Sequence, residues 1–220
     1  MPSFPPADRF GCKICGFTDE ENTRECIEAG AEAIGLNFWP KSKRFLDPEN
    51  ANWVKQLPES VCRIGVFVNA SLKEIRQIHE TGLIHMAQLH GDEDPEFCDA
   101  VDALDIPYIK AIAIKDGDSL NQIRRFPTAS AILLDAYLPG EYGGGGEPFD
   151  WKLAHKAVVE NIEIPIVLSG GLNPENAAEA IEKVGPAAID IASGAEYAPG
   201  LKDPVKVSLL TTIIRDANSG

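Results

Sequence analysis

The stretch Ala131-Ile132-Leu133-Leu134-Asp135-Ala136 is an apolar run that ends in a carboxylate. A short apolar run bounded by turn residues is typical of a buried strand in a parallel sheet. Tyr137-Leu138-Pro139-Gly140 and four glycines, residues 143–146, follow it. An acid between such a strand and a glycine-rich loop indicates an active-site carboxylate in an α/β fold. The alternative is an acid that caps a helix or closes a turn, but several other predicted strands also end in polar residues.

Composition limits the class of protein. The chain has 220 residues, of which 44% are hydrophobic, enough for one large core. We expect a flexible N-terminal tail at residues 1–9, which contain three prolines, and a single domain at 10–220. A net charge of -14 argues against nucleic acid or an anionic membrane as partner. The sequence has no apparent signal peptide or membrane-spanning run, so we expect a cytoplasmic protein.

The five cysteines are odd in number and scattered, which suits a reducing compartment. Cys12-x-x-Cys15 has the spacing of a redox or metal pair. Both lie in one predicted strand, however, where residues three apart point to opposite faces. Because no second pair completes a zinc site, we expect no metal.

Eight strand–helix units run through the chain. Strands are predicted at 10–15, 33–38, 63–68, 86–89, 108–113, 131–135, 164–168 and 188–192, and the helices between them include 47–57 and 119–126. Thr18 and Ser71 each precede a Glu by three residues, which predicts capping boxes. Eight parallel strands with right-handed crossovers indicate an α/β fold, a single (β/α)8 TIM barrel. A doubly wound open sheet is the alternative, but it rarely needs eight units and no Gly-x-Gly-x-x-Gly follows the first strand.

Two glycine-containing turns follow the seventh and eighth predicted strands, at Gly170-Gly171 and Ser193-Gly194. This is the usual phosphate corner of such barrels, where backbone N–H groups meet an anion. Ordinary tight turns are the alternative. Lys13 shares the face of Cys15, and inside a barrel its charge would need a partner such as Asp190. Asp190 could instead contact hydroxyl groups of a sugar.

Several motifs at strand ends occur in an order that resembles one known family. They are Lys13-Ile14-Cys15-Gly16-Phe17-Thr18, Gly30-Ala31-Glu32-Ala33-Ile34-Gly35-Leu36-Asn37-Phe38, Lys41-Ser42-Lys43-Arg44-Phe45, Gly65-Val66-Phe67-Val68-Asn69, Gln88-Leu89-His90-Gly91, Leu134-Asp135-Ala136, Phe149-Asp150-Trp151, Ser169-Gly170-Gly171-Leu172-Asn173-Pro174-Glu175-Asn176 and Asp190-Ile191-Ala192-Ser193-Gly194. In this order and spacing the chain resembles the phosphoribosylanthranilate isomerases of tryptophan biosynthesis.

The resemblance implies a barrel that needs no cofactor. It also implies the reaction, an Amadori rearrangement of N-(5-phosphoribosyl)anthranilate to 1-(2-carboxyphenylamino)-1-deoxyribulose 5-phosphate. It implies that Cys15 is the general base and Asp135 the general acid. By the same resemblance Arg44 binds the anthranilate carboxylate, and His90 matches a histidine at the end of the fourth strand. The phosphate loops fall on Gly170, Gly171, Ser193 and Gly194.

Each role has a simpler alternative. Cys15 could be a packed apolar thiol, but its place at a strand end beside Gly16 favours catalysis. Arg44 could be a solvated cation, although its planar guanidinium matches a carboxylate as the neighbouring lysines do not. His90 could cap a turn or form a hydrogen bond within the site. The glycines at 143–146 could form a loop that closes over substrate or one that is merely flexible.

Two other functions compete with the isomerase. One is a lyase resembling indole-glycerol-phosphate synthase, which Cys15 and the lack of an evident catalytic lysine at the strand ends disfavour. The other is a phosphosugar-binding barrel without catalysis, which would not need both Cys15 and Asp135. The expected partner is the small-molecule phosphoribosyl-anthranilate substrate, and the expected assembly is a monomer or a homodimer.

Overall fold

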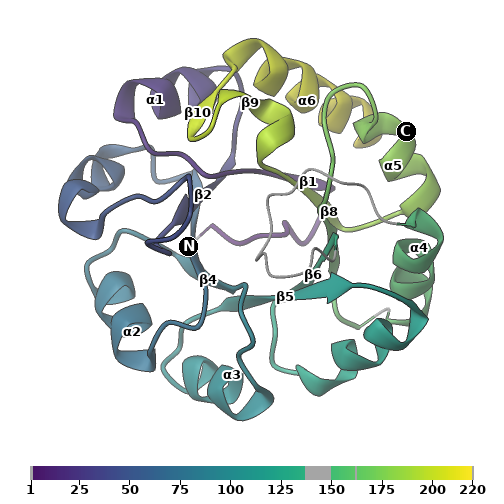
Figure 1. The fold of residues 1–220 in the computed structure, drawn as a ribbon. Helices are drawn as coiled ribbons and strands as arrows, with labels where there is room; N and C mark the ends of the chain where they lie inside the picture. Colours follow the sequence, from purple (N-terminus) through teal and green to yellow (C-terminus); the bar gives the residue numbers. More distant parts are fainter. Residues whose placement is uncertain (1, 137–149, 162, 220) are drawn as a thin grey trace.

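The computed structural model describes residues 2–136, 150–161 and 163–219, and within them eight parallel strands close into a barrel (Figure 1). Each strand pairs with its neighbours in chain order, and β1 pairs with β8 to complete the ring. The strands are β1(Gly11–Cys15), β2(Ala33–Asn37), β3(Cys62–Phe67), β4(Met86–Leu89), β5(Tyr108–Ile114), β6(Ala131–Ala136), β7(Ile166–Leu168) and β8(Ala188–Ile191). The predicted TIM barrel is confirmed.

Helices surround the barrel (Figure 1). The α-helices are α1(Glu20–Glu28), α2(Leu72–Glu80), α3(Pro95–Asp102), α4(Trp151–Glu160), α5(Ala177–Val184) and α6(Pro204–Ala217). Two predicted helices are instead 3₁₀ segments. Residues 47–57 form η1(Pro48–Asn50) and η2(Asn52–Gln56), and 119–126 lies in η3(Gly117–Arg125). The first of these is divided at Ala51, between Asn50 and Asn52, and asparagine has only a weak preference for helix interiors.

Side chains cap the first turns of α1 and α2. Ser71 forms the predicted capping box with Glu74 at the start of α2. The predicted role of Thr18 is wrong: Asp19 caps α1 by accepting a hydrogen bond from the Asn22 N–H. The Thr18 hydroxyl instead donates to the Gly200 carbonyl at 2.9 Å, which ties the start of α1 to the C-terminal part of the chain.

Two apolar cores lie on either side of the strands. The larger core lies between the strands and the helices, and the smaller fills the barrel with side chains such as Ile64, Met86, Ile109 and Leu133. Alternation along each strand separates the two. On β1 this rule sends Lys13 and Cys15 inward and Cys12 and Ile14 outward.

The N-terminal segment contacts the barrel, although we predicted a flexible tail for residues 1–9. Phe4 is 2% exposed and belongs to the core inside the barrel, where its N–H donates to the Met86 sulfur at 3.3 Å. A Cβ placed on Gly11 would lie 3.2 Å from the Phe4 ring. Phe4 therefore closes the N-terminal end of the barrel, and the division into a tail and a domain at residue 10 stays a prediction.

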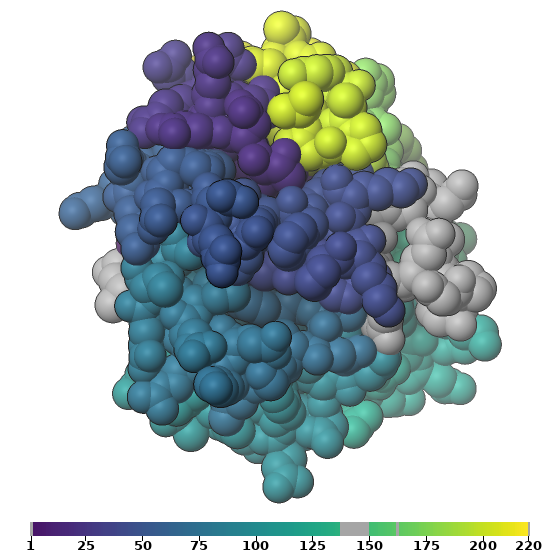
Figure 2. All heavy atoms as spheres, turned by 60° about the vertical axis from the view of Figure 1, so that its left-hand side comes forward, coloured from purple at the N-terminus to yellow at the C-terminus, as the bar shows by residue number. Residues whose placement is uncertain are grey.

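The last helix of the chain packs against the first strand and the first helix. The C-terminal residues, yellow in Figure 2, lie against the purple N-terminal ones, and α6 packs on α1 and β1. A short antiparallel hairpin not predicted from sequence, β9(Glu196–Ala198) and β10(Leu201–Lys202), lies between β8 and α6. No helix in the described parts of the chain is both long and apolar enough to span a bilayer.

Because Phe4 is packed inside the barrel, removing its ring should lower the stability of the protein measurably. Phe4→Ala removes a fully buried ring, so we expect the free energy of unfolding to fall by about 3 kcal/mol in urea denaturation. Val159→Ala, at a side chain that is 60% exposed on α4, is the control and should change it by less than about 0.5 kcal/mol. Equal small effects would show that Phe4 does not pack inside the barrel in solution.

Candidate active site

Two predicted catalytic side chains lie on the inner face of the barrel at its C-terminal end. Cys15 is the last residue of β1 and is 8% exposed, and Asp135 is the last but one of β6 and is 6% exposed. This is the end at which TIM barrels carry their active sites. Asp190 of β8 connects the two, because it pairs with Lys13 below Cys15 and lines a small cavity with Asp135.

Two glycines make room for side chains of the candidate site, Gly35 for Cys15 and Gly16 for Arg44. Gly35 pairs with Cys15 across β1 and β2, and a Cβ there would lie 2.6 Å from the Cys15 sulfur and 3.0 Å from Lys13 Cε. Gly16, at φ +94°, lies against the stem of Arg44, where a Cβ would overlap Cδ. Gly35 occurred in a quoted motif, but only the closed barrel shows that its missing side chain makes space for the thiol.

The buried charges around Cys15 set its acidity. Burial raises the pKa of the Cys15 thiol, Lys13 opposes that shift, and Asp190 reinforces it. Lys13 is fully buried and donates to Asp190 Oδ1 at 2.8 Å. Burial works to lower the pKa of Lys13, but Asp190 and Cys15 together outweigh it and the pKa is raised. Lys13 is therefore a fixed positive charge beneath the thiol, as the predicted pairing with Asp190 requires.

Asp135 is held by a hydrogen-bonded chain that begins at Gln88. The Gln88 side-chain nitrogen lies 2.8 Å from His90 Nδ1, His90 Nε2 lies 3.2 Å from Asp135 Oδ2, and the Ala136 N–H donates to Asp135 Oδ1 at 2.9 Å. With the Gln88 amide in this orientation, neutral His90 carries its proton on Nε2 and donates to a carboxylate. Gln88 is 1% exposed, and its oxygen has no partner within the described residues. Sequence analysis gave His90 a hydrogen bond in the site but gave Gln88 no role.

Arg44 lies beside Cys15 but is engaged with another residue. Its Nε donates to Glu196 Oε1 at 2.7 Å and its Nη2 donates to Glu196 Oε2 at 2.8 Å. Lys202 donates to the same carboxylate at 2.6 Å. Sequence analysis missed Glu196 and Lys202, because they belong to the short hairpin that follows the eighth strand.

The predicted phosphate turns meet next to Asp135. Gly170, Gly171 and Ser193 line a cavity of about 30 Å³ together with Asp135 and Asp190. Gly170 and Gly171 have φ values of +87° and +65°, which favour glycine. A Cβ on Gly194 would overlap the Leu172 carbonyl oxygen, so the two turns touch through their backbones. Their role in phosphate binding stays a prediction, and the glycines at 143–146 lie outside the described residues.

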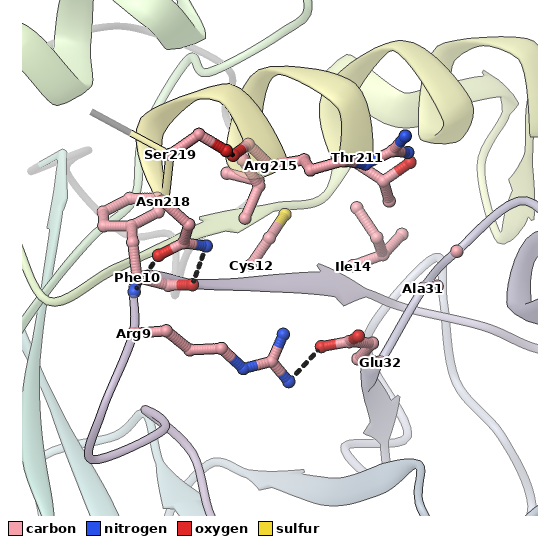
Figure 3. Close-up of a pocket in the computed structure, with 12 residues that line it drawn as sticks. Arg9, Phe10, Cys12, Ile14, Ala31, Glu32, Thr211, Arg215, Asn218 and Ser219 are labelled. Atoms are coloured by element: carbon pink, nitrogen blue, oxygen red, sulfur yellow. Dashed lines mark hydrogen bonds and ion pairs between the residues drawn. The ribbon is translucent and has the colours of Figure 1, made fainter.

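Two larger cavities differ in their relation to these residues. One of about 440 Å³ opens beside His90 and Asp135, over β5 and the segment that follows β4. Another of about 320 Å³ lies outside the barrel between β1 and α6 and contains none of the predicted site residues (Figure 3). There Asn218 bonds the Phe10 backbone, and Arg9 pairs with Glu32 at 2.5 Å.

Cys12 is not part of the site. Figure 3 shows its side chain pointing from β1 toward α6, on the face opposite Cys15, as the spacing predicted. Burial raises the pKa of Cys12 to about 12. Across the described ranges, no group of three or more His, Cys, Asp or Glu residues could hold a metal ion.

Comparison with known proteins assigns the chain to a family by similarity. Residues 12–212 match the model of the N-(5'-phosphoribosyl)anthranilate (PRA) isomerase family. The N-(5'-phosphoribosyl)anthranilate isomerase of Nitrosomonas eutropha is 38% identical over 96% of this chain and 99% of its own length. A structure of monomers of the dimeric phosphoribosylanthranilate isomerase from Thermotoga maritima has a TM-score of 0.82 at 33% identity, over 94% of this chain and 99% of that one. A phosphoribosyl anthranilate isomerase in complex with reduced 1-(o-carboxyphenylamino)-1-deoxyribulose 5-phosphate has a TM-score of 0.80 at 35% identity, with the same shares covered.

The charges beneath Cys15 predict how its reactivity depends on pH. The thiolate is the reactive form, so a raised thiol pKa moves alkylation to higher pH. Lys13→Met removes the opposing cation and should raise the pH midpoint of Cys15 alkylation by iodoacetamide. Asp190→Asn removes the reinforcing anion and should lower it.

The measurement is mass spectrometry of the peptide that contains Cys15, with circular dichroism to confirm folding. Midpoints that stay at the wild-type value in both folded variants would show that this ion pair does not control the thiol.

Proposed function

The chain belongs to the N-(5'-phosphoribosyl)anthranilate isomerase family, and from that premise we propose that Cys15 and Asp135 are the acid–base pair of its reaction. The protein is an isomerase of tryptophan biosynthesis that catalyses an Amadori rearrangement, converting N-(5-phosphoribosyl)anthranilate into 1-(2-carboxyphenylamino)-1-deoxyribulose 5-phosphate. One observation supports this assignment of roles: Cys15 and Asp135 are both buried, face inward and lie at the same rim of the barrel. Asp190 pairs with Lys13 beneath Cys15 and lines a small cavity with Asp135.

Ring opening is the first step. Asp135 donates a proton to the furanose ring oxygen while the bond from that oxygen to C1′ breaks, and the anthranilate nitrogen supplies the electron pair that forms the Schiff base. Asp135 must be protonated to do this. The proton must lie on the carboxyl oxygen that meets the substrate, and Oδ2 can still accept a hydrogen bond from His90 Nε2, the tautomer that the Gln88 nitrogen at His90 Nδ1 favours.

Proton removal is the second step. The Cys15 thiolate takes the proton from C2′, and the electrons of that bond move toward the iminium nitrogen to give an enolamine, which tautomerises to the ketone. Lys13 favours the thiolate while burial disfavours it. Burial outweighs Lys13 and the pKa of the thiol is raised, so the neutral thiol is favoured once the thiolate has taken the proton.

The ends of the substrate must be fixed for both steps to occur on one molecule. We assign its phosphate to the backbone N–H groups around Gly170, Gly171, Ser193 and Gly194, and its carboxylate to Arg44. Asp190 is paired with Lys13 and also lines the cavity beside the phosphate turns. Both roles predicted for it, neutralising Lys13 and contacting sugar hydroxyl groups, are compatible with this position. The monomer or homodimer assembly and the cytoplasmic location stay predictions.

Kinetics of two variants test the catalytic pair. Cys15→Ala removes the base, and Asp135→Asn keeps the shape of the acid but cannot deliver its proton. Each should lower kcat by about 10²–10⁴-fold and leave binding of a reduced product analogue close to normal. Cys12→Ala is the matched control, because it removes a thiol from the same strand on the opposite face.

The double variant should be far less impaired than the product of the two single effects, since both groups serve successive proton transfers on one substrate. If Cys15→Ala kept more than about a tenth of the wild-type kcat, a loss smaller than a general base supplies, Cys15 would not be the base.

The phosphate turns can be tested with inorganic phosphate as a competitor of the substrate. Gly171→Ala adds a methyl group where close backbone approach is needed, and the loss of charge-assisted contacts should weaken phosphate inhibition about tenfold. Gly185→Ala is the control, because Gly185 has the same φ of +65° and no atom within 4 Å of the added Cβ. Equal phosphate inhibition in the two variants would remove Gly171 from the phosphate site.

A further inference from the structure

Arg44, Glu196 and Lys202 form a buried cluster of charges at the C-terminal rim of the barrel. The side chains of Glu196 and Lys202 are 6% and 0% exposed, and that of Arg44 is 14% exposed. Arg44 comes from the loop after β2, whereas Glu196 and Lys202 face each other across the β9–β10 hairpin. The hairpin therefore brings an acid and a second cation to a residue more than 150 positions away in the chain.

Groups other than Arg44 also hold the Glu196 carboxylate in place. Its Oε1 accepts hydrogen bonds from Lys202 Nζ at 2.6 Å and from the Gly200 N–H at 3.1 Å. Lys202 is itself anchored, since its Nζ donates to the Ala192 carbonyl at 3.2 Å and its backbone exchanges two hydrogen bonds with the Asn22 side chain. Burial works to raise the pKa of Glu196, but Arg44 and Lys202 outweigh it and lower the pKa, so Glu196 is ionised.

The pairing uses only one edge of the guanidinium. Nε and Nη2 each donate to Glu196, which orients the plane of the group. Of the five N–H bonds of an arginine, the two on Nη1 and the second on Nη2 take no part in this pairing and form a second fork that matches a carboxylate. The stem of Arg44 passes over Gly16, the residue that follows Cys15, so Arg44 lies at the same end of the barrel as the thiol.

The charge of the cluster also fits a single anion. Arg44 and Lys202 carry two positive charges and Glu196 one negative charge, which leaves one positive charge unbalanced. A carboxylate bound at the outer edge would complete two ion pairs. Without Glu196, the long Arg44 side chain would have to be ordered by the substrate, at the entropic cost of fixing several rotatable bonds.

We propose that Glu196, held by Lys202, is a positioning residue that fixes the Arg44 guanidinium so that its outer edge selects substrates with a carboxylate on the aromatic ring. Glu196 does not touch the substrate and acts through Arg44. This inference rests on the proposed function, because it assumes that Arg44 is the group that receives the carboxylate.

The test compares two ligands that differ only in this carboxylate. One is reduced 1-(o-carboxyphenylamino)-1-deoxyribulose 5-phosphate, and the other is its phenylamino counterpart without the carboxyl group. Calorimetric titration of the wild type should show about ten- to hundredfold tighter binding of the carboxylated ligand, the range expected for a charge-assisted pair. Glu196→Gln should lose most of that preference and leave the affinity for the carboxyl-free ligand within about twofold.

Four further variants sharpen the comparison. Arg44→Ala should abolish the preference, and the double variant Arg44→Ala, Glu196→Gln should bind like Arg44→Ala alone, because Glu196 acts through Arg44. Glu196→Asp keeps the charge but shortens the reach, and it should give an intermediate preference even if Glu196→Gln folds poorly. Glu179→Gln is the matched control, since it removes an exposed carboxylate paired with Lys183 on α5 and should leave both affinities unchanged. In turnover, Glu196→Gln should raise KM by more than it lowers kcat.

Two results would overturn the proposal. Equal weakening of both ligands by Glu196→Gln would mean that Glu196 only stabilises the hairpin, and tighter binding of the carboxylated ligand would mean that Glu196 competes with the substrate for Arg44. The proposed function fails separately, if the wild type neither turns over phosphoribosylanthranilate nor prefers the carboxylated ligand. If the wild type does both and Glu196→Gln keeps the preference, only the positioning role is wrong.

Discussion

The buried ion pair between Lys13 and Asp190 lies where the barrel closes. These residues are register partners of β1 and β8, the first and last strands, and both face inward. Removing two charges from water is costly, and leaving one of them unpaired is costlier still. The pair therefore favours the register in which Lys13 lies opposite Asp190, and that register puts Cys15 one layer above a cation. The closure of the fold and the surroundings of the proposed catalytic thiol depend on the same contact.

The same arrangement recurs around the rim. Lys110 of β5 is buried, pairs with Glu93 at 2.9 Å, and donates to the carbonyl oxygens of Leu89 and Gly91, on either side of His90. Lys202 supports Glu196 and through it Arg44. In each case a buried lysine fixes a loop or strand end that carries a site residue. The active-site groups are thus held by charge pairs in surroundings of low polarity, where such pairs orient side chains strongly.

The sequence predicted the barrel and the positions of the proposed catalytic residues Cys15 and Asp135 at strand ends, because buried strands leave local patterns. Apolar runs that end in Cys15, His90 and Asp135 mark strands whose C-terminal ends meet at one rim. The contributions of Gln88, Gly35 and Glu196 could not be predicted in this way, since they depend on pairing between strands or on a hairpin of three and two residues. The packing of Phe4 could not be predicted for a related reason: three prolines indicated a loose segment, but the barrel has an open N-terminal end that an aromatic ring fills.

A crystal structure of the protein with reduced 1-(o-carboxyphenylamino)-1-deoxyribulose 5-phosphate tests the central claim most directly, namely that Cys15 and Asp135 act on one substrate held between Arg44 and the phosphate turns. The account predicts the C2′ atom beside the Cys15 sulfur and the 4′ oxygen within hydrogen-bond distance of Asp135. The phosphate should lie on the backbone of Gly170, Gly171, Ser193 and Gly194, with the carboxylate on the outer edge of Arg44. A ligand bound with its phosphate away from these turns, or with C2′ far from Cys15, would contradict it.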